Sequence, residues 1–311
     1  MRTLPLTLAA ALAALATGCA VEAVDGRFPP QTRPEPDADV ATDGGPTLDA
    51  GQPVLTDPTG QWLLFIEDRN CLFTVGNGVE ALIWSWYLVD IEPTGPGRAS
   101  LRQRTRMCHQ ELSPLTFGFL SIVPDEVPES APDAEFEGFL AGSTAGSIYV
   151  SGTLTELWGA ERVAADEALP ASTDDPRVID QDGDGSPGVT FPVQTPTGVE
   201  VCRVFVTQRM HHALGGAVVD GRRIEGTAET TIEKVVLAAS TDLCASGDVI
   251  PNDAGNRFVL VRVDGAAGSP DADTDGDGAV ECAELRGALA TIMANYGIEQ
   301  SEPDARTWCN P

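Results

Sequence analysis

Segments in which apolar residues recur at every second position constrain the fold of this chain most strongly. They are rich in β-branched and aromatic residues, and turns rich in Gly, Pro and Asp separate them. Because successive side chains of a strand point to opposite faces, this period predicts strands. The predicted strands are Trp62–Glu67, Ala81–Ile91, Ala99–Cys108, Ser147–Trp158, Val189–Gln194, Val199–Gln208, Arg223–Ala238 and Arg257–Val263. We therefore expect a mainly β fold, an antiparallel barrel or a two-sheet sandwich of about eight strands.

Two long loops are expected between these strands, at Pro124–Pro132 and Ala165–Gly188, and no helix is expected before Leu285. Trp84, Trp86 and Tyr87 are expected to fill a core or to line the mouth of a barrel.

The acidic segment Asp273–Glu284 carries the most specific chemical pattern in the chain. Its oxygen donors stand at positions 1, 3, 5, 7, 9 and 12 of a twelve-residue loop, with Gly278 at position 6. This spacing resembles the EF-hand calcium loop, in which the position-7 ligand is a backbone carbonyl, position 9 acts through water and position 12 supplies both carboxylate oxygens. The resemblance implies a Ca²⁺ site formed by Asp273, Asp275, Asp277, Ala279, Glu281 and Glu284.

The flanks of this loop predict half of an EF-hand. Leu285–Tyr296 has apolar residues at helical spacing, and Gly297 is suited to end the helix. Upstream, Phe258–Val263 alternates like a strand, and the Gly- and Pro-containing segment 265–270 cannot form an entering helix. We expect a loop and an exiting helix attached to the β domain, with Val280 packing the loop onto its support.

A second acidic segment, Asp180–Phe191, matches only the first half of the pattern. Asp180, Asp182 and Asp184 occupy positions 1, 3 and 5, but position 12 is Phe191. Without a bidentate carboxylate, a metal there needs other donors, and Asp174 and Asp175 are the nearest ones. The segment is equally well interpreted as a weak second Ca²⁺ site or as a turn before a strand.

The first residues predict export. Arg2 precedes the apolar run Leu4–Leu15, which is shorter than a membrane-spanning helix needs, and small residues end it before Cys19. The segment 1–18 resembles a bacterial lipoprotein signal peptide, which implies that Cys19 carries a lipid and anchors the chain to a membrane. Ala20 after that cysteine resembles signals for the outer membrane of Gram-negative bacteria. An ordinary secretory signal is the alternative.

Four regions follow from these patterns. Residues 1–18 form the signal peptide, and the Pro- and Asp-rich residues 19–58 form a disordered tether, since they hold too few large apolar side chains to fold. Residues 59–269 form the β domain, and residues 270–311 form the calcium loop and the C-terminal helix.

Six cysteines remain besides Cys19, and an even number in an exported chain predicts three disulfides. The sequence does not choose among fifteen pairings, and we expect bonds between neighbours in the chain. These pairs are Cys71–Cys108, Cys202–Cys244 and Cys282–Cys309.

Charge and motifs argue against several functions. The net charge of −28 disfavours nucleic acid as a partner. Arg102, Arg104 and Arg106 share one face of a strand, where an anion site is one interpretation; pairing with Glu225, Glu229 and Glu233 of another strand is the interpretation we favour. His109, His211 and His212 form no metal motif, and the chain has no Gly-x-Ser-x-Gly or His-Glu-x-x-His sequence.

Two broader resemblances do not indicate a reaction or a ligand. Gly60-Gln61-Trp62 is similar to the opening of lipocalins, and Asp175–Thr190 before a β-rich half is similar to predicted lipoproteins of Gram-negative soil bacteria that have no known activity. We expect a non-enzymatic, calcium-binding lipoprotein of the cell envelope with an unknown protein or small-molecule partner. A calcium-stabilised secreted hydrolase, for example one acting on polysaccharide, and a barrel that carries an apolar ligand are the alternatives.

Overall fold

The computed structural model describes residues 55, 57–74, 77–95, 99–115, 118–241, 244, 248–251 and 255–303. The contacts of the chain group Asp49–Pro311 into one compact unit, separate from Met1–Leu48. The expected signal peptide, Cys19, nearly all of the expected tether and Cys309 therefore lie outside the described residues. No helix in the described part is long and apolar enough to cross a membrane.

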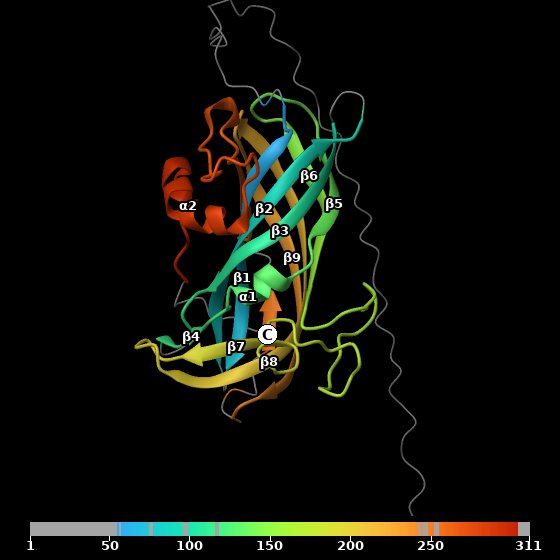
Figure 1. Ribbon diagram of the computed structural model, residues 1–311, viewed down its shortest axis with the longest axis vertical. Helices are drawn as coiled ribbons and strands as arrows, with labels where there is room; N and C mark the ends of the chain where they lie inside the picture. The colour runs from blue at the N-terminus through green and yellow to red at the C-terminus, as the bar shows by residue number, and fades with distance from the viewer. Residues whose placement is uncertain are drawn as a thin grey trace, which may run out of the picture. The chain divides into compact units, whose positions relative to one another are not determined.

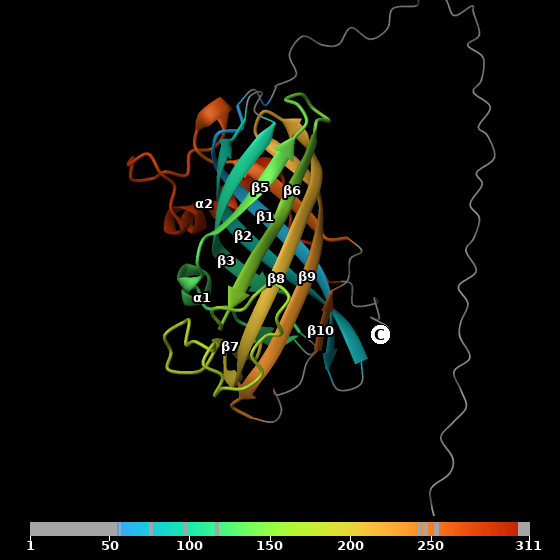
Figure 2. The ribbon, with the colours of Figure 1, turned by 90° about the vertical axis from the view of Figure 1, so that its right-hand side faces the viewer.

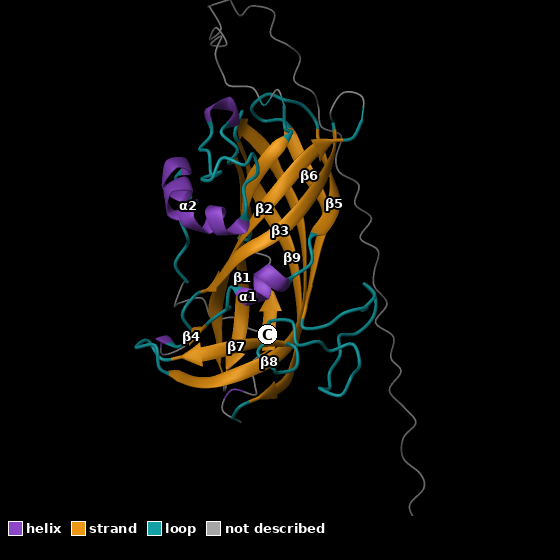
Figure 3. Ribbon diagram, viewed as in Figure 1, coloured by secondary structure: helices purple, strands orange, loops and turns teal. Residues whose placement is uncertain are grey.

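The described residues are mainly β and form one large antiparallel sheet with two α-helices (Figure 3). The helices are α1 (Glu126–Ser130) and α2 (Cys282–Tyr296), and a 3₁₀ turn covers Ala266–Gly268. The strands are β1 (Gly60–Thr74), β2 (Asn77–Pro93), β3 (Ser100–Leu112), β4 (Leu120–Ser121), β5 (Ala134–Leu140), β6 (Ile148–Trp158), β7 (Val189–Gln194), β8 (Glu200–Asp220), β9 (Arg223–Ala239), β10 (Asp248–Pro251) and β11 (Arg257–Arg262).

The sheet closes on itself because β8 pairs with both β6 and β9 (Figures 1 and 2). Following the hydrogen bonds gives the ring β8-β6-β5-β3-β2-β1-β11-β9, which returns to β8. The strands β4, β7 and β10 extend the sheet outside this ring. Closure leaves the ring without a free edge, so its backbone donors and acceptors are paired within the chain.

Two apolar clusters lie on the two sides of this closed sheet. The inner cluster includes Trp62, Leu64 and Ile66 of β1, and the outer cluster includes Leu63 and Phe65, the residues between them. Helix α2 covers the outer cluster, which explains why β1 lacks a polar face over Trp62–Ile66 (Figure 1). In contrast, β3 alternates buried and exposed residues from Ser100 to Met107, because solvent covers its outer face.

The aromatic residues of β2 divide between these clusters. Trp84 and Trp86 belong to the outer cluster beneath the C-terminal segment, whereas Tyr87 belongs to the inner one. The register of β2 against β3 shifts between Trp86 and Tyr87, at a bulge. The C-terminal segment therefore rests on a tryptophan-rich surface that the closed ring alone would expose.

Several expected boundaries were wrong. Helix α1 lies inside the segment 124–132, which we expected to be a loop, and it packs Val127 into the inner cluster. Strand β5 was missed, and β8 continues twelve residues beyond Gln208, through two glycines and two histidines. Helix α2 begins at Cys282, three residues earlier than predicted, and ends at Gly297 in the left-handed conformation as predicted.

A polar layer interrupts the inner apolar cluster. Thr230 of β9 donates a hydrogen bond to Asp68 of β1 (2.6 Å) and lies 3.1 Å from Nδ1 of His212 on β8. Tyr87 donates to Glu156 of β6 at 3.0 Å. Burial raises the pKa of Asp68, lowers the pKa of His212 and raises the pKa of Glu156 to about 8, even though the side chain of Glu156 keeps some contact with solvent. Asp68 and Glu156 therefore favour their neutral forms more than exposed carboxyls do.

The Glu156 carboxyl predicts lower stability at alkaline pH. Its pKa is near 8 in the folded chain and near 4.5 in an unfolded one, so folding retains a proton that the unfolded chain loses between these pH values. Stability from this group is present below pH 4.5 and falls as pH rises to about 8. The full pKa difference over pH 5 to 8.5 corresponds to about 4 kcal/mol, and contact of the side chain with solvent reduces it. We therefore expect Glu156→Gln, which can still accept from Tyr87, to gain roughly 2 kcal/mol of stability relative to wild type between pH 5 and pH 8.5 in urea unfolding. Glu137→Gln, on the exposed face of β5, is the matched control and should show no such gain.

Candidate metal centre

Three carboxylates of the segment 273–284 converge. Each of Asp273, Asp275 and Asp277 offers an oxygen within 4.8 Å of the other two. The backbone amides of Gly276 and Gly278 donate to the two oxygens of Asp273 at 2.6 and 2.8 Å. Both glycines have positive φ, 78° and 93°, so the chain turns sharply enough for alternate aspartates to face one point. Exposure of the loop leaves these carboxylates accessible to a hydrated cation.

The last residues of the loop also begin helix α2. Glu281 is the N-cap, and it forms a capping box with Glu284. One Glu284 oxygen accepts from the backbone amides of Thr274 and Asp275 and from the Thr274 hydroxyl; the other accepts from the amide of Glu281. These bonds, that from Glu281 first, lower the pKa of Glu284 to about 2. Glu284 is therefore ionised at neutral pH and lies across the beginning of the loop.

The loop is attached to the closed sheet through its eighth position. Val280 is buried in the outer cluster, as expected for the residue that packs the loop on its support. The side-chain amide of Gln61 on β1 accepts from the Val280 N–H at 2.6 Å and donates to the Val280 carbonyl at 3.3 Å. Upstream of the loop, the amide of Ala272 donates to the carbonyl of Val263.

The disulfides differ in part from the predicted pairs. Cys108 of β3 bonds to Cys282, position 10 of the loop, so the predicted pairs Cys71–Cys108 and Cys282–Cys309 were wrong. The pair Cys202–Cys244 was predicted correctly. Cys71 is also disulfide-bonded. The neighbour rule failed for Cys108 because the sheet brings two cysteines 174 residues apart to a Cα separation of 4.9 Å.

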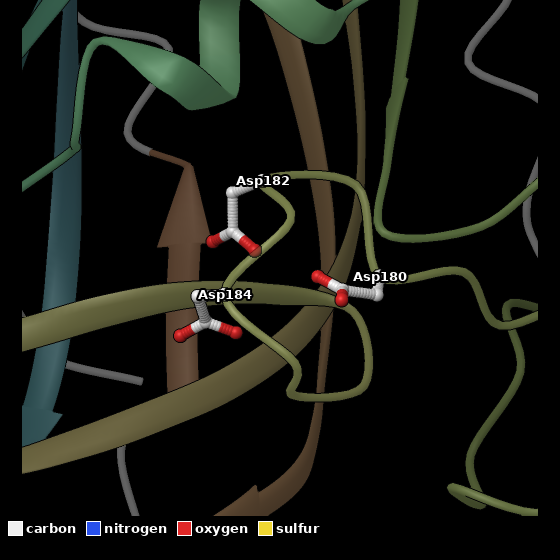
Figure 4. A group of neighbouring side chains, drawn as sticks. All are labelled: Asp180, Asp182 and Asp184. Carbon is white, nitrogen blue, oxygen red and sulfur yellow. The ribbon is translucent and has the colours of Figure 1, made fainter.

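The second acidic segment repeats the first half of the loop (Figure 4). Asp180, Asp182 and Asp184 also offer oxygens within 4.8 Å of one another. Gly185, at position 6, donates to Asp180 at 2.9 Å, as Gly278 does to Asp273. Positive φ recurs at positions 4 and 6, with 70° at Gly183 and 87° at Gly185. The shared Asp-x-Asp-Gly-Asp-Gly sequence thus folds into the same type of turn twice.

After position 6 the two loops diverge. Gly188, at position 9, pairs with residues 179–181, and the amide of Thr190 donates to Asp182 at 2.8 Å. The chain then continues into β7, and no carboxylate follows at position 12. The carboxylate of Asp175, an expected extra donor, instead forms an ion pair with Arg177 that lowers its pKa to about 2. The first segment therefore has the more complete set of donors.

The alternating arginines pair with acids, but not with those we expected. Arg104 and Arg106 share Asp133, and Arg102 pairs with Glu92 of β2. Strand β3 lies between β2 and β5, so it has no contact with the β9 glutamates through the sheet. Of those glutamates, Glu225 pairs with Arg223 and Glu233 with Arg209.

Sequence reasoning missed two sets of residues. Gln61 lies 219 residues before Val280, and no local spacing links them. The second set is the buried polar layer, to which His212 belongs. Successive residues of β8 face opposite sides of the sheet, so His211 contacts Thr155 whereas His212 is fully buried. The only signal in the sequence for the burial of His212 is its place in the alternating pattern, on the face of β8 that points into the ring.

No family model, curated protein or solved structure matches the chain.

The disulfide between Cys108 and Cys282 should stabilise the chain more than the one between Cys202 and Cys244. The two bonds span 174 and 42 residues, and the loss of unfolded-state entropy grows with the logarithm of that span. We expect replacement of both partners by alanine to cost roughly 3–5 kcal/mol for the first bond and about 1 kcal/mol less for the second. Urea unfolding of the two double variants measures this order, and a reversed order would contradict it.

Proposed function

We propose that the chain is a calcium-binding protein of the cell envelope without catalytic activity, in which Ca²⁺ clamps the C-terminal segment to a β-barrel. The observation that carries this proposal is the convergence of Asp273, Asp275 and Asp277 within a turn closed by Gly276 and Gly278. The spacing of the remaining donors, Ala279, Glu281 and Glu284, agrees with it.

The donors in the loop suit calcium better than a transition metal. They are carboxylate and carbonyl oxygens, which hard cations prefer. Among the described residues, the two groups of side chains close enough to share a metal ion consist of aspartates and contain no histidine or cysteine. One Glu284 oxygen accepts only from the Glu281 amide and keeps a lone pair for a cation, whereas the other accepts from three donors. The loop Asp273–Glu284 contains five acidic residues and no basic one, so its own side chains supply no cation.

A structural clamp fits the position of the loop. Its ends continue into β11 on one side and into α2 on the other, and α2 covers the outer apolar cluster. Further along, Ser301 donates to the buried carboxylate of Glu67, and the Tyr296 carbonyl accepts from Arg223. Binding to the folded form alone would add about 1 kcal/mol at millimolar Ca²⁺ if the Kd is ~10⁻⁴–10⁻³ M.

The envelope location rests on the sequence from Arg2 to Ala20, and a lipid on Cys19 would link the chain to the membrane. The alternative of an apolar carrier needs a hollow interior, whereas the fully buried side chains of Trp62, Trp158, Tyr149 and Phe258 lie inside the closed sheet.

Calorimetric titration with Ca²⁺ tests the proposal. The oxidised chain from Cys19 onward, without lipid and stripped of metal, should bind one ion and melt at a higher temperature with Ca²⁺. Glu284→Gln should abolish most of this binding, because it removes the bidentate carboxylate. Glu299→Gln, an exposed acid of the same segment outside the loop, is the control and should bind as wild type does.

Further outcomes are informative. A second ion that disappears in Asp182→Asn would assign the weaker site to the segment 180–184. If wild type releases no heat at 5–10 mM Ca²⁺, which exceeds the weak end of the extracellular range, the proposed function is wrong.

A further inference from the structure

We infer that Gln61 is a positioning residue for the calcium loop: its side-chain amide aims the Ala279 carbonyl at the metal and the Glu281 amide at Glu284. The inference rests on the proposed calcium site and adds a residue that the loop pattern does not contain. It follows from the two hydrogen bonds that Gln61 makes with Val280.

The first bond fixes the peptide between Ala279 and Val280. Val280 N–H points at the Gln61 side-chain oxygen, 2.6 Å away. The peptide is planar and trans, since the described residues contain no cis bond, so its carbonyl points in the opposite direction to its N–H. The Ala279 oxygen is therefore turned away from β1. Ala279 is position 7, the only position that offers a backbone carbonyl as a ligand.

The second bond fixes the next peptide in the same way. The Val280 carbonyl accepts from the Gln61 side-chain nitrogen at 3.3 Å, so the Glu281 N–H points away from Gln61. That N–H donates to Glu284 at 3.0 Å. One amide thus orients both the carbonyl at position 7 and a donor that holds the carboxylate at position 12. The Gln61 side-chain amide pairs with both backbone groups of Val280, as the backbone of a neighbouring strand residue would.

Gln61 itself is held firmly enough for this role. Its backbone belongs to β1, where it faces Asp90 of β2. The backbone carbonyl of Gln61 accepts from the Val263 N–H at 3.0 Å, and its backbone N–H donates to the Asp264 carboxylate at 3.2 Å. Its neighbour Trp62 is fully buried. The supporting residue is therefore part of the rigid closed sheet, and the loop is positioned from outside itself.

Gln61→Met tests the inference, because methionine has a similar length but neither donates nor accepts strongly. We expect Ca²⁺ affinity to fall about tenfold in calorimetric titration of the oxidised chain, within the range for lost supporting contacts of metal ligands. With alanine labelled by ¹³C at its carbonyl, the Ala279 resonance should shift on Ca²⁺ addition in wild type and shift less in the variant. Gln300→Met removes one exposed contact, to Glu111, and is the matched control that should keep wild-type affinity.

Four outcomes separate the possibilities. If wild type binds Ca²⁺ and Gln61→Met binds equally well, with an unchanged Ala279 shift, Gln61 only fastens the loop and the inference is wrong. A lower melting temperature without any change in Kd leads to the same conclusion. If wild type does not bind Ca²⁺ at all, the proposed function fails first. A weaker Kd with an unaltered circular dichroism spectrum of the metal-free variant supports the inference.

Discussion

The pairing of β8 with both β6 and β9 is the interaction on which the rest of the structure depends. It converts a row of strands into a ring, and the ring creates an inside and an outside from the same alternating sequence. Every strand of the ring contributes side chains to the inner apolar cluster, so the inside needs no further cover. On the outside, the C-terminal segment covers β1, β2, β11 and Cys108 of β3, whereas the outer face of β3 from Ser100 to Arg106 is exposed.

This division explains why the acidic loop lies where it does. A loop of five carboxylates cannot be buried, but Val280 and Cys282 within it belong to the outer cluster. Apolar and covalent contacts therefore hold the loop against the sheet, while the charged residues on either side remain in water. The second acidic turn is attached differently: Gln181 bonds to Gly159 and Val127, and the chain then leads into β7. Two turns with one sequence pattern thus differ in what surrounds them.

The sequence predicted what depends on neighbours along the chain. Strands β7 and β9 were placed within a residue of their observed bounds, and the carboxylates of the loop lie within twelve consecutive residues. It failed where distant segments decide. Strand β5 holds glutamates and a glycine that weaken its alternation, and only pairing with β3 and β6 makes it a strand. Cys108 bonds to Cys282, and Gln61 contacts Val280, because the C-terminal segment packs on the outside of the ring. A spacing of residues along the chain cannot predict such contacts between distant segments.

The disulfide between Cys108 and Cys282 also determines whether proteolytic cleavage separates the chain into two pieces. Between Trp158 and Val189 the chain forms only turns and isolated bridges, and many of its residues are exposed. That stretch lies inside the 174-residue interval that the disulfide spans. A single cut there breaks the backbone without dividing the molecule, because both pieces remain covalently joined and interlocked in one ring of strands. In an extracellular setting such a chain can be nicked and still persist as one particle, with the cleavage visible only after reduction.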